Sequence, residues 1–144
     1  AEGAVHWGNP HGAKLIVFSD FQCGYCQRLA AELAKAGLHV EERPISIFGK
    51  ESRAIAEAVI CAADPAKALH AAYAGQAPKA TKPCKAADAL DANEAFAKAH
   101  GFNGTPVIVR PSDGAILEGY RPASVLREFL KPAKAAAPVP AKKG

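Results

Sequence analysis

The sequence predicts an α/β fold in which one mixed sheet is flanked by helices. Two short apolar runs, at 14–19 and 105–110, are rich in β-branched residues and typical of strands buried on both faces. Alanine-rich segments with helical spacing separate these runs, and a turn signal at 112–114 joins the second run to a partner strand at 115–118. A chain of 144 residues has room for one domain of ordinary size. We therefore expect one core with strands of both directions.

The first apolar run is followed at once by a helix. Because residues 14–19 are apolar almost without interruption, we expect them at the centre of the sheet. After a short turn, Cys26, Leu29 and Leu33 repeat at helical spacing as far as Gly37, a favourable C-terminal stop. The pattern predicts a strand, a turn and a helix in succession.

The middle of the chain is predicted to be mostly helical. Residues 38–47 alternate apolar and polar side chains around Pro44, which cannot donate a ladder hydrogen bond, so we expect a strand at an edge or with a bulge. Helical patterns follow at 51–62, 65–74 and 85–100. They predict a helical insertion over about residues 51–100.

Both ends of the chain are expected to lie outside a domain of residues 13–130, whose last helix begins near Pro122. Residues 1–12 have the pattern of an irregular leader or the remnant of an interdomain linker. Residues 131–144 are almost entirely Ala, Pro and Lys and cannot bury enough apolar surface to offset the entropy of ordering. We expect this segment to be a disordered tail.

Charge and hydropathy argue against two classes of function. The net charge is +4, but four lysines of the tail account for it, since residues 1–130 carry 14 basic and 14 acidic side chains. This balance provides no basic stripe for nucleic acid. No run approaches the roughly 18 to 20 apolar residues that a membrane helix needs. We expect neither a nucleic-acid partner nor a membrane span.

A Cys-x-x-Cys motif, formed by Cys23, Gly24, Tyr25 and Cys26, lies where the first strand turns into a helix. Unpaired backbone N–H groups at a helix start favour the thiolate of Cys23, and a thiolate is the nucleophile of disulfide exchange. Cys26 lies one turn later on the same face, close enough to attack a disulfide formed on Cys23. The motif predicts a redox pair in which Cys23 attacks and Cys26 resolves, with no other cofactor.

A metal site is an alternative use of this motif. Structural zinc also uses Cys-x-x-Cys, but it needs a second clustered ligand pair, and Cys61 and Cys84 are 23 positions apart. We expect no bound metal. A bond between Cys61 and Cys84 would anchor the irregular connector and contribute about 3 kcal/mol. Two buried free thiols are the alternative; a structural disulfide would imply an oxidising compartment.

Segments far apart in the chain carry a resemblance to a known family. The strand, the Cys-x-x-Cys motif at a helix start and the later Gly104, Thr105 and Pro106 resemble the thioredoxin superfamily over about residues 13–130. The resemblance implies a thioredoxin-like mixed sheet with flanking helices and a helical insertion.

Further positions make the resemblance more specific. Residues 18–26, the cysteines Cys61 and Cys84, and the pair Gly119 and Tyr120 are similar to the catalytic domain of bacterial periplasmic disulfide isomerases of the DsbC/DsbG type. This likeness implies a structural disulfide between Cys61 and Cys84. It also implies a periplasmic thiol-disulfide oxidoreductase, foremost a disulfide isomerase or reductase.

The resemblance also implies partners. Substrates would be unfolded or wrongly disulfide-bonded exported proteins, and a membrane electron donor of the DsbD type would keep the redox pair reduced. A monomeric DsbA-like oxidase that donates its disulfide, or a non-catalytic metal-binding module, are the alternatives.

Family geometry assigns the substrate contacts. Pro106 is implied to be a cis-proline that faces the redox pair, and Thr105 to offer its backbone to an extended substrate segment in the manner of an added strand. Gly24 and Tyr25 would also contact substrate. Tyr25, Phe21 and Tyr120 are candidates for an apolar surface around the site, Tyr25 foremost, and simple packing near the strand end is the alternative.

The sequence departs from related patterns in two ways. Thioredoxins and DsbA-type oxidases place a buried acid six residues before the first cysteine, where this chain has Val17, so the proton-transfer role of that acid has no occupant at this position. Asp20 is interpreted as a turn or capping residue. Isomerases of this type also carry an N-terminal dimerisation domain, whereas about 12 residues precede the first predicted strand. A lone domain should exchange disulfides yet isomerise poorly.

Overall fold

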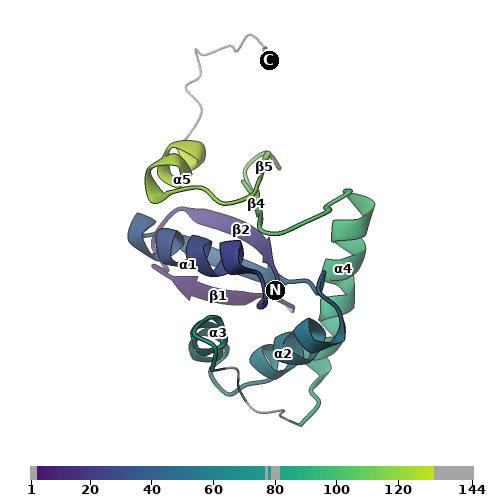
Figure 1. Cartoon of the computed structure of the whole chain (residues 1–144). Coiled ribbons are helices and arrows are strands. Elements are labelled where there is room, and N and C mark those ends of the chain that lie inside the picture. The colour runs from purple at the N-terminus through teal and green to yellow at the C-terminus, as the bar shows by residue number, and fades with distance from the viewer. Residues whose placement is uncertain (1–2, 77, 79–81, 132–144) are drawn as a thin grey trace.

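The structure, a computed structural model, describes residues 3–76, 78 and 82–131 (Figure 1). Within these residues the strands are β1 (Val5–Gly8), β2 (Lys14–Ser19), β3 (His39–Pro44), β4 (Val107–Val109) and β5 (Ile116–Glu118). The helices are α1 (Gly24–Ala36), α2 (Lys50–Ile60), α3 (Pro65–Tyr73), the 3-10 helix η1 (Lys85–Ala89), α4 (Leu90–Ala99) and α5 (Ala123–Leu130). The predicted tail lies outside the described residues, apart from its first position.

The strands form one mixed sheet in the order β1-β3-β2-β4-β5. Strand β2 is central, as its continuous apolar run predicts, and it runs parallel to β3 and antiparallel to β4. Strands β1 and β5 pair antiparallel to β3 and β4. The predicted α/β class with a mixed sheet and flanking helices is confirmed.

Strand β1 corrects the expectation of an irregular leader. Val5 and Trp7 are buried and His6 and Gly8 are exposed, which is the alternation of a strand with one covered face. The strand has only four residues, and the last of them is a glycine, so its pattern is too short to be recognised in the sequence. Because β1 pairs with β3, the edge position expected for residues 38–47 is also wrong.

Pro44 is compatible with an internal strand because it is the last residue of β3. Its missing N–H therefore falls where the ladder ends, and Ile45 continues with an N–H bond of 2.7 Å to the carbonyl of Ser19. A proline inside the strand would have removed a ladder bond.

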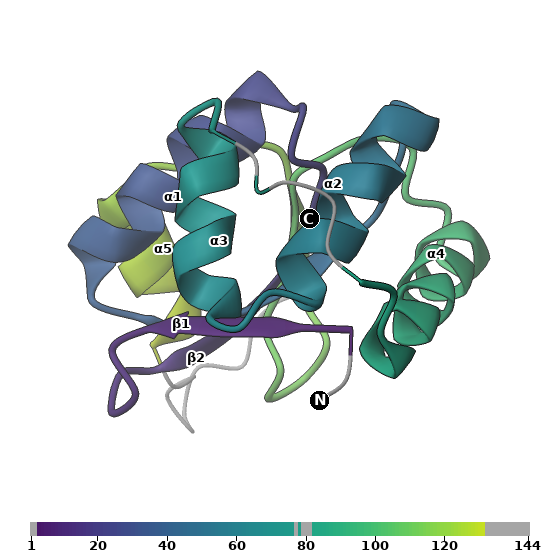
Figure 2. The same cartoon turned by 90° about the horizontal axis from the view of Figure 1, so that it is seen from below.

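Helices cover both faces of the sheet. Figure 2 shows α1, α3 and α5 on one side of strands β1 and β2. The core on that face joins Leu15 and Val17 of β2 to Leu29 and Leu33 of α1 and to Leu126 of α5. Alternate residues of a strand point to opposite faces. The residues of β2 that alternate with Leu15 and Val17 therefore face the other side of the sheet, where a second core lies.

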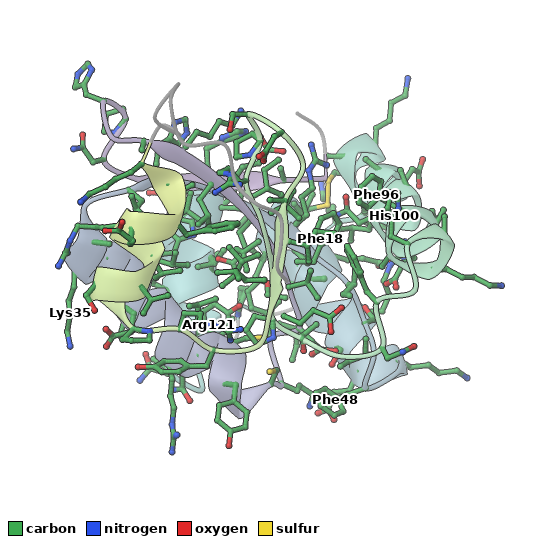
Figure 3. The ribbon with its side chains drawn as sticks, turned by 90° about the horizontal axis from the view of Figure 1, so that it is seen from above. Phe18, Lys35, Phe48, Phe96, His100 and Arg121 are labelled. Atoms are coloured by element: carbon green, nitrogen blue, oxygen red, sulfur yellow. A yellow bond between two sulfur atoms is a disulfide. The ribbon has the colours of Figure 1, made fainter. Side chains whose placement is uncertain are left out.

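The second core lies between the sheet and α4. Phe18 of β2 stacks on Phe96 of α4, with ring centroids 5.3 Å apart, and Phe96 in turn stacks on His100 at 4.0 Å. Figure 3 shows these three rings grouped together. The buried residues of this core are Phe18, Ile45, Ala97, Phe102, Val107 and Val109.

The helices of the insertion are joined by a disulfide. Cys61 follows α2 and Cys84 precedes η1, and their Cα atoms lie 5.6 Å apart with a bond between the two sulfurs. Asp64 caps α3 by accepting the N–H of Lys67 at 3.2 Å. Among the described helices, none is both long and apolar enough to cross a bilayer.

Candidate active site

A buried carboxylate shapes the turn that leads from β2 to the cysteine pair. Asp20 is completely buried and accepts hydrogen bonds from the N–H of Gln22 at 2.8 Å, the N–H of Phe48 at 3.0 Å and the hydroxyl of Ser52 at 2.6 Å. Its own carbonyl accepts the N–H of Cys23 at 2.9 Å. Asp20 therefore fixes the turn and ties it to the loop before α2.

Cys23 is the N-cap residue of α1, with extended backbone angles of φ −93° and ψ 119°. Its Sγ accepts a hydrogen bond from the backbone N–H of Cys26 over 3.2 Å, so the sulfur occupies the position at which a capping oxygen normally sits. On its other side the thiol donates to the carbonyl of Thr105 over 3.6 Å. The sulfur of Cys23 is thus held between a main-chain donor and a main-chain acceptor.

The two free thiols differ in exposure. Cys23 retains 7% of its surface and Cys26 only 2%. Burial raises the pKa of the Cys26 thiol far above its ordinary value, and a hydrogen bond with Cys23 adds to this shift. Cys26 is therefore protonated at neutral pH and is more deeply buried than Cys23, an asymmetry suited to one attacking and one resolving sulfur.

The loop before β4 forms the second side of the site. The peptide bond between Thr105 and Pro106 is cis. The carbonyl of Pro106 accepts the N–H of Gly119 at 2.8 Å, whereas the carbonyl of Thr105 faces the thiol of Cys23. A shallow hollow of about 280 Å³ adjoins this loop and is lined by residues from Asn103 to Val107 together with Glu118 and Gly119. The structure thus brings Thr105 and Pro106 to the redox motif.

The apolar surface near the site differs from the one expected. Tyr25 is 59% exposed, but Phe21 is buried and packs on the ring of Tyr73 at 5.1 Å, because it points into the core below the turn. Tyr120 is only partly exposed. Phe48, 57% exposed, was not anticipated; it stands in an irregular loop, where no periodic pattern marks it.

The backbone of Phe48 lies beside the turn before the cysteine motif, because its N–H is hydrogen-bonded to Asp20, three residues before Cys23. Figure 3 shows its side chain projecting outward from the ribbon. The neighbouring Ile47 is 41% exposed. Gly24 has open space where a Cβ would stand, which leaves room beside the motif.

Sequence reasoning also missed a buried acid. Glu42 on β3 is only 2% exposed, and in the parallel register it lies directly opposite Val17 of β2. The position six residues before Cys23 is apolar, as noted, but a carboxyl group occupies the adjacent strand. Two successive glutamates in a predicted strand are the signal that could have revealed it, because one of them must face the core.

Metal ligands do not converge in the part of the chain that the structure describes. No group of three or more His, Cys, Asp or Glu side chains in residues 3–76, 78 and 82–131 is arranged to hold a metal ion. Cys61 and Cys84 are joined to each other, so neither is offered as a thiolate ligand beside the Cys-x-x-Cys motif.

Comparison with known proteins shows the family to which the chain belongs. A family model described as "Thioredoxin-like domain" matches residues 7–134. The thiol:disulfide interchange protein DsbC of Escherichia coli (strain K12) is 32% identical over 121 residues, which cover 81% of this chain and 50% of that protein. The chain thus spans about half the length of the curated relatives it matches.

Solved structures agree in fold. A disulfide interchange protein from Neisseria gonorrhoeae superposes with a TM-score of 0.77 at 28% identity, covering 89% of this chain and 93% of that one. ScsC of Proteus mirabilis, in a transitional conformation, superposes with a TM-score of 0.74 at 22% identity, covering 90% and 72%, and shares the fold. The match over most of the chain shows that this protein belongs to the thioredoxin-like family, with bacterial disulfide interchange proteins among its relatives.

Proposed function

We propose that this chain is a thiol-disulfide oxidoreductase that acts on the disulfides of other proteins, with Cys23 as nucleophile and Cys26 as resolving thiol. One observation carries the proposal. The sulfur of Cys23 lies at the start of α1, between the N–H of Cys26 and the carbonyl of Thr105, and is the more exposed of the two thiols. A sulfur held at a helix start beside an open backbone loop is suited to attack a disulfide in an extended segment.

The reaction follows from this arrangement. The Cys23 thiolate attacks one sulfur of a substrate disulfide, forms a mixed disulfide and releases the other substrate sulfur as a thiolate. A substrate thiolate can then attack the mixed disulfide and leave with a new pairing, which is isomerisation. Alternatively, Cys26 attacks the sulfur of Cys23, releases a reduced substrate and leaves the redox pair oxidised.

Substrate recognition is proposed to use main chain and a small apolar surface. The backbone of Thr105 would bind an extended segment next to Cys23, which tolerates many sequences. Tyr25, Ile47 and Phe48 have exposed side chains, and we propose that they form this apolar surface together. Such a surface favours unfolded or wrongly disulfide-bonded proteins, because these expose apolar residues near their cysteines.

The direction of electron flow is part of the proposal. Similarity to DsbC supports a disulfide isomerase or reductase, and the bond between Cys61 and Cys84 supports an oxidising compartment such as the periplasm. An isomerase that sometimes releases reduced substrate must be reduced again, so we propose a membrane electron donor of the DsbD type as partner.

The thiol state in the cell tests this direction. Rapid acid quenching of periplasmic extract, followed by thiol alkylation and gel electrophoresis, should find Cys23 and Cys26 reduced at steady state. A pair that is mostly oxidised would instead indicate a disulfide-donating oxidase. Zinc that stays bound through dialysis against a chelator would point to a metal-binding module.

A purified-protein assay tests the activity itself. Reduction of insulin disulfides by dithiothreitol should be accelerated by the wild-type chain and not by Cys23→Ala. A chain that accelerates the reaction equally with Cys23 replaced would contradict the proposed role of this residue. A Lys50→Ala variant, altered at an exposed position at the start of α2, serves as the control.

A further inference from the structure

Glu42 is a buried carboxyl group on the same side of the sheet as the redox pair. Its partner in the parallel register, Val17, belongs to the core formed with α1 and α3, and side chains paired in this way share a face. Three donors surround the carboxyl group: Trp7 Nε1 at 2.9 Å from Oε1, and the hydroxyls of Ser19, at 2.6 Å, and Tyr73 on Oε2. Nothing in the exchange chemistry described above uses this group.

The surroundings of Glu42 accommodate both of its protonation states. An ionised carboxylate only accepts hydrogen bonds and is satisfied by the three donors. If Glu42 binds a proton, the hydroxyl of Ser19 or Tyr73 can rotate and accept it, since a hydroxyl both donates and accepts. Burial raises the pKa of Glu42 above its ordinary value, against the opposite effect of its hydrogen bonds. The group can thus take up a proton without losing its partners.

Tyr73 connects Glu42 to the cysteine motif. Its hydroxyl donates to Glu42, its ring packs on Phe21, two residues before Cys23, and its carbonyl accepts the side-chain amide of Gln27, the residue after Cys26. Cys26, Phe21 and Tyr73 lie in one buried cluster. Burial raises the pKa of Tyr73, and the negative charge of Glu42, together with that of Cys26 when it is ionised, raises it further.

We propose that Glu42 accepts the proton that Cys26 loses when it resolves a mixed disulfide, with the Tyr73 hydroxyl as the group through which the proton passes. This inference rests on the proposed exchange function and adds a residue to it. Glu42 acts through Tyr73, so it is a positioning residue for the proton and does not touch the reacting sulfurs.

The step balances without an external reactant. The Cys26 S–H bond breaks, its proton moves to the oxygen of Tyr73, and the Tyr73 proton moves to the carboxylate of Glu42. The Cys26 thiolate then attacks the sulfur of Cys23, so that the bond between Cys23 and Cys26 forms and the bond between Cys23 and substrate breaks. The substrate leaves as a thiolate. Two electrons have passed from the two cysteines to the substrate, and Glu42 later returns its proton to solvent.

Cys26 needs a nearby proton acceptor at this step because its thiol is buried. Cys26 is 2% exposed and its thiol has a strongly raised pKa, so direct transfer of its proton to bulk water is hindered. A positioned acid or base typically changes the rate of such a transfer by about a hundredfold or more.

Other charged or titratable groups that face Glu42 affect how the release rate depends on pH. Helix α3 contributes Tyr73 and His70, on which a positive charge favours the carboxylate, and strand β2 contributes the hydroxyl of Ser19. Strand β1 contributes the neutral indole of Trp7. A His70→Gln variant is measured in parallel to separate the contribution of this imidazole from that of Glu42.

The experiment measures release of substrate from a preformed mixed disulfide. Reduced protein is joined through Cys23 to a fluorescent peptide in acid, where Cys26 cannot react, and a jump to higher pH starts the release. In Glu42→Gln and Tyr73→Phe, release at neutral pH should slow roughly a hundredfold. The deficit should shrink as pH rises, because hydroxide then deprotonates Cys26 directly.

Glu41→Gln is the matched control. Glu41 is also a buried glutamate of β3, but it pairs with Ile16 in the register, faces the opposite side of the sheet and forms ion pairs with Lys14 at 2.9 Å and Arg43 at 2.7 Å. Its release rate should match that of the wild type at each pH. Equal slowing in both variants would indicate a general loss of packing and would overturn the proposal.

A second measurement keeps the inference separate from the function on which it rests. In a Cys26→Ala background, the rate at which Cys23 attacks a peptide disulfide should be the same with Glu42 or with Gln at that position. If attack is absent in both, the proposed exchange function fails. If attack is normal and release is either unchanged or slowed by the same factor at every pH, the exchange function stands and the role of Glu42 is wrong.

Discussion

The backbone N–H of Cys26 donates a hydrogen bond to the sulfur of Cys23 across 3.2 Å, so the more deeply buried cysteine of the pair holds the other one at the start of α1. Asp20 fixes the turn from below through the N–H of Gln22 and the hydroxyl of Ser52. Thr105 faces the same sulfur from the loop before β4. The sulfur of Cys23 is therefore contacted by main-chain groups of two segments and lies next to a turn that the Asp20 carboxylate fixes.

Alkylation should discriminate between the two thiols. Brief treatment of the reduced chain with iodoacetamide at neutral pH is expected to modify Cys23 at least about tenfold faster than Cys26, because burial shields Cys26 and raises its pKa. Mass spectrometry of proteolytic peptides measures the ratio. In urea the ratio should approach one, and a native protein that reacts equally at both positions would contradict the assigned asymmetry.

The exposed aromatic ring of Phe48 should matter for protein substrates alone. Phe48→Ser is expected to raise the KM for an unfolded disulfide-bonded protein about fivefold, equivalent to about 1 kcal/mol of apolar contact. The KM for a small disulfide should not change. Ile116→Ser, which removes an exposed apolar side chain of β5, is the control. A similar loss in both variants would remove Phe48 from the substrate surface.

The second cysteine pair should affect stability rather than chemistry. Replacing Cys61 and Cys84 together with alanine opens a loop closed across 23 positions and should lower the free energy of unfolding by about 3 kcal/mol. Urea titration followed by circular dichroism measures this change. Insulin reduction by the folded variant should remain close to wild type; loss of activity in fully folded protein would show that the insertion contributes to the site directly.

Glu42 should also leave a signature in the pH dependence of stability. Its pKa is raised in the fold above the ordinary value of 4.5, so between these two values the native state binds more protons than the unfolded state. Stability from this group is therefore present in acid and is lost as pH rises toward the folded pKa. Glu42→Gln removes that loss, so the free energy of unfolding of the variant minus that of wild type should increase from pH 4.5 toward neutrality. A constant difference would contradict the raised pKa.

Much of the fold could be predicted from the sequence because its central elements have strong patterns. The apolar run of β2 indicates a strand that is buried on both faces. The spacing of Leu29 and Leu33 indicates that α1 is a helix with one buried face. Strand β1 could not be predicted, since its four residues gain their stability from pairing with β3, a contact of long range. The position of β3 inside the sheet was missed for the same reason.

Some residues of the candidate site could likewise be predicted from the sequence, and others could not. The Cys-x-x-Cys motif is local, so the sequence places it at a helix start, and the family resemblance extends the site to Thr105 and Pro106. Phe48 carries no local signal, and the two successive glutamates of β3 indicate a buried acid without placing it at the site. Phe48 reaches it through a hydrogen bond to Asp20, and Glu42 through the register of two parallel strands and a contact with α3. Such relationships appear only when distant segments are packed together.

Trapping of the mixed disulfide tests the central claim most directly. Cys26→Ala and Cys23→Ala are each incubated in reduced form with a disulfide-bonded protein, quenched in acid and analysed by non-reducing electrophoresis and mass spectrometry. The account predicts that Cys26→Ala accumulates a substrate linked through Cys23 and that Cys23→Ala forms no adduct. Adducts through Cys26, or none in either variant, would contradict the assignment of Cys23 as the attacking sulfur.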